Sequence, residues 1–257
     1  MEFTGGVRQI GLKQDVRERT YDRFTGQQLG QEDFPLADSE TLNLGQASAA
    51  LVYDTSIAGI TSPIRGSRTR LELSQSTGTL QYSGVLADYR TYFMPKQPFT
   101  IALRGLYYGR YGRDAESGRL PTMFLGYPGL VRGYDQGSFQ AGECGIQADG
   151  SCPVFDRLIG SRVGVANAEL RFPLWGAFGG QGFYGPLPVE IALFGDAGIA
   201  MGATDGFSGI NEKWVKSVGV AARVNVFGFA VAEINYVKPL DRRGRGWLWQ
   251  FNFSPGF

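Results

Sequence analysis

The sequence predicts an all-β fold, an antiparallel transmembrane β-barrel, from its last segment, its alternating residue pattern and its composition. Residues 247–257 place Trp247, Trp249, Phe251, Phe253 and Phe257 on one face of a strand and small or polar residues on the other. A soluble sheet that turned this face to water would aggregate, whereas the lipid-facing side of a barrel favours it. From this segment alone, an aromatic strand inside a soluble sandwich is the alternative.

The composition argues against two other classes of protein. The chain has 38 Gly and 18 Phe among 257 residues, a formal net charge of +1 and a mean hydropathy of -0.14. These values exclude a basic nucleic-acid binder and a helical membrane protein. Even the most apolar stretch, residues 215–234, contains Lys216, Arg223, Asn225 and Glu233. A strand can turn such side chains inward, but a membrane-spanning helix tolerates them poorly.

Gly, Pro, Asp and Ser clusters divide the chain into about ten predicted strands, and no segment predicts a convincing helix. The predicted strands are residues 2–21, 42–56, 68–76, 80–93, 99–111, 162–174, 189–201, 214–227, 229–238 and 246–257. Most of them reach the roughly 9–11 residues that a tilted membrane strand requires. Aromatic residues near the ends of the fourth and fifth strands, among them Tyr92, Phe93, Tyr107 and Tyr108, are typical of the girdles of a barrel.

Three later strands sort polar and apolar side chains onto opposite faces. In 162–174 the inner face holds Asn167, Glu169 and Arg171, opposite Ala166, Ala168, Leu170 and Phe172. In 189–201 it holds Glu190 and Asp196, opposite Val189, Ile191, Leu193, Ala197 and Ile199. In 214–227 it holds Ser217, Arg223 and Asn225, opposite Val218, Val220, Ala222, Val224 and Val226. Soluble sheets alternate as well, so this pattern indicates a barrel only together with strand length and end aromatics.

The longest connection, residues 112–161, is too long for a simple turn and contains the most specific motif of the chain. This motif consists of Val131, Arg132, Gly133 and Tyr134. The planar guanidinium of Arg132 suits two carboxylates better than a Lys would, and Gly133 allows close backbone approach or a positive φ. An exposed Arg that binds nothing is the alternative interpretation.

The motif resembles the Val-Arg-Gly-Phe/Tyr segment of the BamA/TamA superfamily, the bacterial surface antigen family of barrels that insert proteins into outer membranes or secrete them across. The resemblance implies that this connection folds back into the lumen. It also implies that Arg132 meets two acidic residues, Glu169 and Asp196, which strand parity turns inward independently.

Two further segments resemble the same family, so the resemblance covers nearly the whole chain. Residues 53–55 and 63–66 are similar to a hairpin of the family, although Ser56 and Ile57 replace its usual Arg and Asp. The last strand, with Trp249, Phe251, Phe253 and the terminal Phe257, is similar to its C-terminal assembly signal.

The superfamily that this chain resembles builds barrels of sixteen strands, whereas this chain predicts about ten. We therefore expect residues 1–257 to form the C-terminal part of an outer-membrane barrel domain, with the 112–161 connection folding into the lumen. No secretory signal begins at Met1, so a signal or a larger part of the polypeptide is expected upstream. The implied partners are outer-membrane lipid, client outer-membrane or secreted polypeptides and the machinery that assembles barrels.

Both cysteines of the chain, Cys144 and Cys152, lie in the long connection. A periplasmic or cell-surface setting is oxidising, so a local disulfide is expected, worth about 2–3 kcal/mol by loop-closure entropy. Free buried cysteines are the alternative. A metal site is disfavoured because the chain has no His and only two thiols.

The absence of His also disfavours the barrel enzymes, phospholipases and omptin-like proteases, that use His to activate an alcohol or water. No phosphate loop, CxxC pair or dinucleotide fingerprint is found, so we expect no catalysis, cofactor or metal. Two functions are left open. One is an insertion or translocation barrel that recognises client strands by edge pairing, and the other is a passive anchor or pore carrying an upstream soluble domain.

Overall fold

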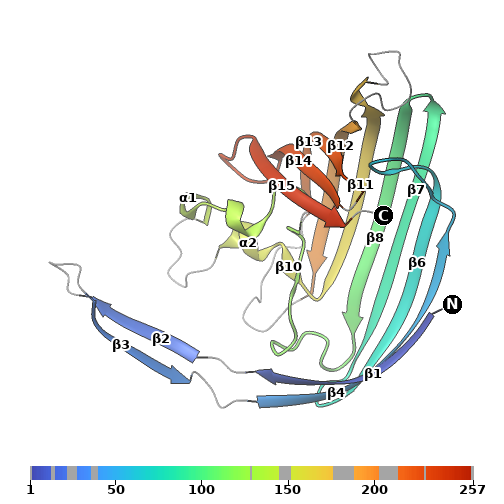
Figure 1. Cartoon of the computed structure of the whole chain (residues 1–257). Helices are drawn as coiled ribbons and strands as arrows, with labels where there is room; N and C mark the ends of the chain where they lie inside the picture. Colours follow the sequence, from blue (N-terminus) through green and yellow to red (C-terminus); the bar gives the residue numbers. More distant parts are fainter. Residues whose placement is uncertain are drawn as a thin grey trace.

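The computed structural model describes residues 2–12, 15–21, 28–35, 40–127, 129–144, 152–175, 188–202, 214–228 and 230–255. Its main feature is one strongly curved antiparallel sheet (Figure 1). The prediction of an all-β, antiparallel fold with about ten main strands is confirmed. Among the described residues, no helix is both long and apolar enough to cross a membrane.

Each main strand pairs with its neighbours along the chain, in the order β1-β4-β6-β7-β8-β11-β12-β13-β14-β15. The bounds are β1 Glu2–Leu12, β4 Glu40–Asp54, β6 Pro63–Gly78, β7 Tyr82–Lys96, β8 Phe99–Tyr111, β11 Arg162–Pro173, β12 Val189–Met201, β13 Val215–Val226, β14 Ala230–Pro239 and β15 Leu248–Pro255. This up-and-down order is the simplest wall of a barrel, because consecutive strands need only a turn between them. Within the described part of the chain, β1 and β15 are the two unpaired edges of the sheet.

Smaller elements lie in the connections. They are β2 Asp15–Tyr21, β3 Gln28–Pro35, β5 Ile57–Ala58, β9 Met123–Phe124, η1 Gln136–Ser138, α1 Ala141–Cys144, α2 Pro153–Asp156 and β10 Ile159–Gly160. The sequence predicted no helix, and the two α-helices are single turns of four residues within the long connection.

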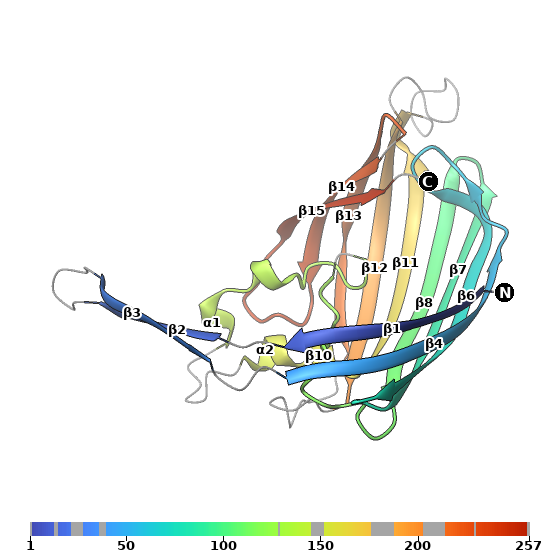
Figure 2. The same ribbon diagram turned by 60° about the horizontal axis from the view of Figure 1, so that its bottom comes forward.

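The first predicted strand, 2–21, was wrong in one respect, because two strands occupy it. β1 pairs with β4, whereas β2 pairs only with β3 in a separate two-stranded sheet. This second hairpin extends away from the main sheet (Figures 1 and 2). β1 ends at Leu12, and β2 begins at Asp15 with a different partner.

The convex face of the sheet is apolar and uncovered. One row across six adjacent strands consists of Ile101, Leu170, Leu193, Val220, Tyr236 and Trp249. In β15, Trp249 is 66% exposed and Phe253 is 74% exposed, and Phe251 lies on the same face. The side chains that parity assigned to lipid therefore pack against no second protein layer among the described residues, while Phe257 lies outside those residues. A membrane barrel requires such an uncovered apolar face, whereas a soluble sandwich buries its apolar face against a second sheet.

The concave face carries the described part of the long connection between β8 and β11, residues 112–127, 129–144 and 152–161 (Figure 1). Leu125, Val131, Tyr134 and Leu158 of this connection are buried against side chains of the sheet. The sheet partners in that cluster are Val163, Val165, Ala200 and Val215. A local apolar core thus fixes the connection to β11, β12 and β13 and positions the residues next to Val131.

Candidate functional site

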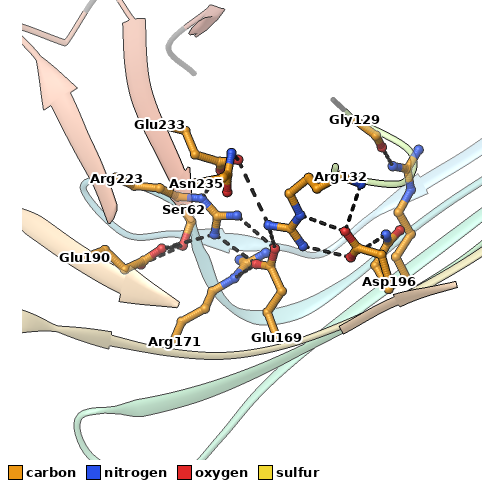
Figure 3. Close-up of polar contacts among 12 residues, drawn as sticks. Ser62, Gly129, Arg132, Glu169, Arg171, Glu190, Asp196, Arg223, Glu233 and Asn235 are labelled. Carbon is orange, nitrogen blue, oxygen red and sulfur yellow. Dashed lines mark hydrogen bonds and ion pairs between the residues drawn. The ribbon is translucent and has the colours of Figure 1, made fainter. Parts of the chain in front are cut away.

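The side chain of Arg132 joins two adjacent strands of the sheet through carboxylates (Figure 3). Its Nε and Nη2 donate hydrogen bonds of 2.8 Å each to the two carboxylate oxygens of Asp196 on β12. Its Nη1 lies 2.8 Å from Oε1 of Glu169 on β11. Arg132 is only 4% exposed, so both ion pairs are removed from bulk water. The structure thus brings together the Arg and the two acidic residues that the sequence assigned to it.

The register of β11 and β12 explains why both carboxylates reach the same guanidinium. Asp196 pairs directly with Asn167, and Glu169 follows Asn167 on the same face two residues later. The Asn167 amide donates 2.9 Å to Asp196 and 2.8 Å to the carbonyl of Leu130, just before the motif. The guanidinium also lies 3.4 Å from the centroid of the Phe194 ring, a cation–π contact.

The two residues after Arg132 hold the connection to the end of the sheet. Gly133 has φ +85, and a Cβ at that position would lie 3.0 Å from a methyl carbon of Val237, so a side chain would be both strained and crowded. The Gly133 N–H donates 3.0 Å to Oε1 of Gln250 on β15. The hydroxyl of Tyr134 donates 2.8 Å to the carbonyl of Lys216, and burial raises the Tyr134 pKa to about 12. This phenol therefore stays a proton donor at physiological pH.

Glu169 is the centre of a larger set of charges, which we call the ionic cluster. The cluster consists of Arg132, Arg171, Arg223, Glu169, Glu190, Asp196 and Glu233 (Figure 3). Glu169 accepts hydrogen bonds from Arg171 at 2.7 Å and from Arg223 at 2.8 and 2.9 Å. Arg223 also contacts Glu190 and Glu233. Buried charges of this kind are tolerated only when each has a partner, and here every member has one.

A second connection also reaches the concave face. The residues between β4 and β6 include the hairpin that the sequence singled out, and Thr61 and Ser62 donate hydrogen bonds to Glu190 of the ionic cluster. Between this hairpin and the Arg132 segment lies a cavity of about 440 Å³. Its walls include Ala58, Arg90, Arg104, Leu130 and Val231.

Cys144 and Cys152 form a disulfide, which joins α1 to the start of α2. Glu143, next to Cys144, makes two hydrogen bonds of 2.7 and 2.8 Å with Arg242 from the turn between β14 and β15. Arg242 also donates 2.8 Å to the carbonyl of Gly133 and 2.9 Å to that of Ser138. One arginine therefore holds three parts of the long connection together.

Sequence reasoning missed several of these residues. Parity placed Arg171 and Arg223 on the inner face, but it could not assign their partners. Gln250 gave only the signal of a polar residue opposite the aromatic face, and Arg242 gave none, because it lies in a turn 109 residues from Gly133. Among the described residues, no group of three or more His, Cys, Asp or Glu could hold a metal ion.

An exposed apolar convex face and a charged concave face together define the wall of an outer-membrane β-barrel. The Omp85 superfamily domain matches residues 2–257, and the chain belongs to this superfamily. It is accordingly a β-barrel protein of the bacterial outer membrane.

The fold resembles a solved structure described as BamA from Haemophilus ducreyi lacking POTRA domains 1-3. The two share 18% sequence identity with a TM-score of 0.58, and the match covers 84% of this chain and 42% of that chain. The chain thus spans less than half of that BamA. No curated protein sequence matches the chain.

Proposed function

We propose that this chain is the barrel part of an outer-membrane protein that inserts or translocates polypeptides, with its long connection clamped in the lumen by Arg132. The observation that carries the proposal is the fork of Arg132 on Asp196 and Glu169. Membership of the Omp85 superfamily and the likeness to a BamA barrel support the activity. We further propose that the ten strands form the C-terminal part of a larger barrel, which is supported by the lack of a pairing partner for the β1 and β15 edges among the described residues.

The contacts of Arg132, Gly133 and Tyr134, which we call the clamp, would hold the barrel wall in shape while a client strand pairs with the β15 edge. Arg132 is tied to β11 and β12, Gly133 to Gln250 of β15, and Tyr134 to the carbonyl of Lys216 in β13. The connection therefore braces strands that lead up to the β15 edge. A client strand that pairs with this edge needs only backbone N–H and C=O groups in a fixed line, without bond chemistry. The proposed partners are client polypeptides, outer-membrane lipid and the machinery that assembles barrels.

The test is client insertion by the full-length protein in liposomes. An unfolded outer-membrane polypeptide is added, and its folding rate is compared for the parent, Arg132→Ala and Arg70→Ala. Arg70 also pairs with a carboxylate on the concave side, Glu72, but it is 40% exposed and lies outside the ionic cluster. We expect Arg132→Ala to slow client folding and Arg70→Ala to leave it unchanged.

The alternative function is a passive anchor or pore. In that case client folding in the presence of the parent protein equals that in empty liposomes, whatever stands at position 132. The same assay therefore separates the two functions, because only an insertion barrel accelerates the parent reaction.

A further inference from the structure

The connection between β4 and β6, residues 55–62, contains β5, which pairs with the start of β6, and it folds onto the concave face of the sheet (Figure 1). We call this segment the strap. Its last two residues, Thr61 and Ser62, are 2% and 5% exposed, which is unusual for polar residues of a short connection. The strap belongs to the hairpin motif of the sequence, and the function proposed for Arg132 above does not explain why Thr61 and Ser62 are buried.

The backbone at the base of the strap sets its direction. Gly66 has φ +96, and a Cβ there would lie 2.1 Å from the carbonyl oxygen of Thr55. The Thr55 N–H donates 2.8 Å to the carbonyl of Ser67, and the Asp54 carboxylate accepts 2.9 Å from the Ser56 N–H. These bonds close the hairpin and turn the intervening residues inward.

The strap ends on strands that are distant from its own in the sheet. Ser62 donates to both carboxylate oxygens of Glu190 on β12, at 2.7 and 2.9 Å, and Thr61 donates 3.0 Å to the same carboxylate. The Asn225 amide of β13 donates to the carbonyl of Ile60. Glu190 is 3% exposed, so these bonds form away from bulk water.

An unbroken chain of polar contacts runs from the strap to the Arg132 segment. Glu190 lies 3.5 Å from Arg223, Arg223 donates 2.8 Å to Glu169, and Glu169 lies 2.8 Å from Arg132. Figure 3 shows the side chains of Glu190, Arg223, Glu169 and Arg132 pointing toward one another. Charged groups that share partners in this way respond to each other's removal, because the remaining groups must change partners.

We infer that Glu190 is a positioning residue that seats the strap, and that the ionic cluster couples the strap to the Arg132 segment. The two segments bound the 440 Å³ cavity from different sides. Loosening either one therefore loosens the other and widens the concave space through which a polypeptide would have to pass. This inference rests on the proposed function only for its consequence, since the coupling itself concerns the protein without client.

A spin label on the strap tests the inference. Cys144 and Cys152, the two cysteines of residues 1–257, are joined in a disulfide, so Ala58→Cys adds one free thiol to this part of the protein, on an exposed strap residue. Any cysteine outside residues 1–257 is replaced by Ser in every protein compared. The full-length protein in detergent micelles is labelled with a nitroxide, and its electron paramagnetic resonance spectrum is recorded. We expect an immobilised component in the parent, and its loss when Glu190→Gln or Arg132→Ala is added.

The control is Glu72→Gln, which makes the same change to a carboxylate of β6 that pairs with Arg70, outside the cluster. This variant should keep the immobilised component. If Glu190→Gln does not fold, the double variant Thr61→Val with Ser62→Ala removes the same hydrogen bonds without altering any charge, and it should mobilise the label.

An immobilised label in both the Glu190→Gln and the Thr61→Val, Ser62→Ala proteins would overturn the seating role of Glu190. A label mobilised by these changes but not by Arg132→Ala would overturn the coupling. Equal mobilisation by Glu72→Gln would show a general loosening of the sheet and would also overturn the inference. Because no client is present, these outcomes are distinct from a failure of client insertion.

Discussion

At the scale of the residue, the concave face is organised by arginines that each satisfy more than one partner. Arg132 binds two carboxylates through its fork, and Arg242 binds a carboxylate and two carbonyl groups. Five donors in a rigid plane make this possible, whereas a lysine has a single ammonium. Removing such a residue therefore leaves several buried acceptors without a hydrogen-bond donor at once.

Arg132→Ala is expected to destabilise the folded protein by about 3–5 kcal/mol, because Asp196 and Glu169 would keep buried charges with fewer partners. Urea titration in detergent micelles measures the change. Arg70→Ala provides the comparison, and because that side chain is 40% exposed, its loss should cost about 0–1 kcal/mol. Equal costs for the two variants would mean that the Arg132 site is wet and does not clamp the connection.

A second residue-scale prediction concerns pH. The hydrogen bond from Arg242 lowers the pKa of Glu143 below its ordinary value of 4.5. A carboxylate with a lowered folded-state pKa contributes stability above the unfolded value, and that contribution is lost as the pH falls through the folded value. The stability difference between the parent and Glu143→Gln should therefore be constant from neutral pH to about 5 and shrink below 4.5. Urea titrations of both proteins across this range would contradict the prediction if the difference stayed constant.

Strand period predicted which face a residue occupies, and a partner was predicted only for Arg132, from the family resemblance. Strand period alone turned Glu169 and Asp196 inward, and the Arg132 motif supplied the cation that meets them. Gln250 and Arg242 could not be assigned, because their contacts depend on how the long connection folds. Period has no meaning in a segment of irregular backbone, so the interactions made by such a segment must be seen in the structure.

At the scale of the element, the long connection is fixed at several separate points. Its apolar residues pack on β11 to β13, Arg132 binds the carboxylates, and Arg242 ties its later part to the turn after β14. The disulfide joins α1 to the start of α2 at some distance along the chain from the Arg132 motif. We infer that the disulfide stabilises a substructure of the connection and that the clamp does not depend on it.

Replacing both Cys144 and Cys152 by Ser tests this division of roles. By the loop-closure argument the change should lower stability by about 2–3 kcal/mol at most. The loss should appear as easier local unfolding of the connection and not of the whole sheet. Hydrogen exchange should rise in α1 and α2 while the strands remain protected. Exchange that rises equally in β11 and β12 would show that the disulfide supports the sheet as well.

Strand bounds illustrate what local pattern can and cannot fix. The strands Phe99–Tyr111 and Val189–Met201 match their predicted bounds, because Gly and Pro punctuation coincides with the ends of pairing. The segment 2–21 was read as one strand, yet its second part pairs with Gln28–Pro35 instead of the main sheet. A change of partner leaves no mark on the period of a strand, so sequence reasoning could not detect it.

At the scale of the whole molecule, the decisive property is the solvent of each face. The convex face exposes a continuous row of large apolar side chains across six strands, and the concave face holds the charges and both inward-folded segments. An exposed apolar surface of that extent is a liability in water and a requirement in hydrocarbon. One substitution can therefore report which solvent the convex face meets.

Val220 lies near the middle of β13, on the convex face, and is 39% exposed. If the face meets lipid, Val220→Arg places a charge near the bilayer midplane and should cost about 2–4 kcal/mol of folding free energy in lipid vesicles. Val226→Arg, on the same face at the end of the strand, should cost only about 0–1 kcal/mol because the charge can reach the interface. A convex face in water predicts something different, since an exposed surface substitution there changes stability by about 0.5 kcal/mol or less at either position. The difference in the free energy of unfolding between Val220→Arg and Val226→Arg, measured by urea titration in vesicles, thus tests the membrane assignment. This test makes no assumption about what the barrel transports.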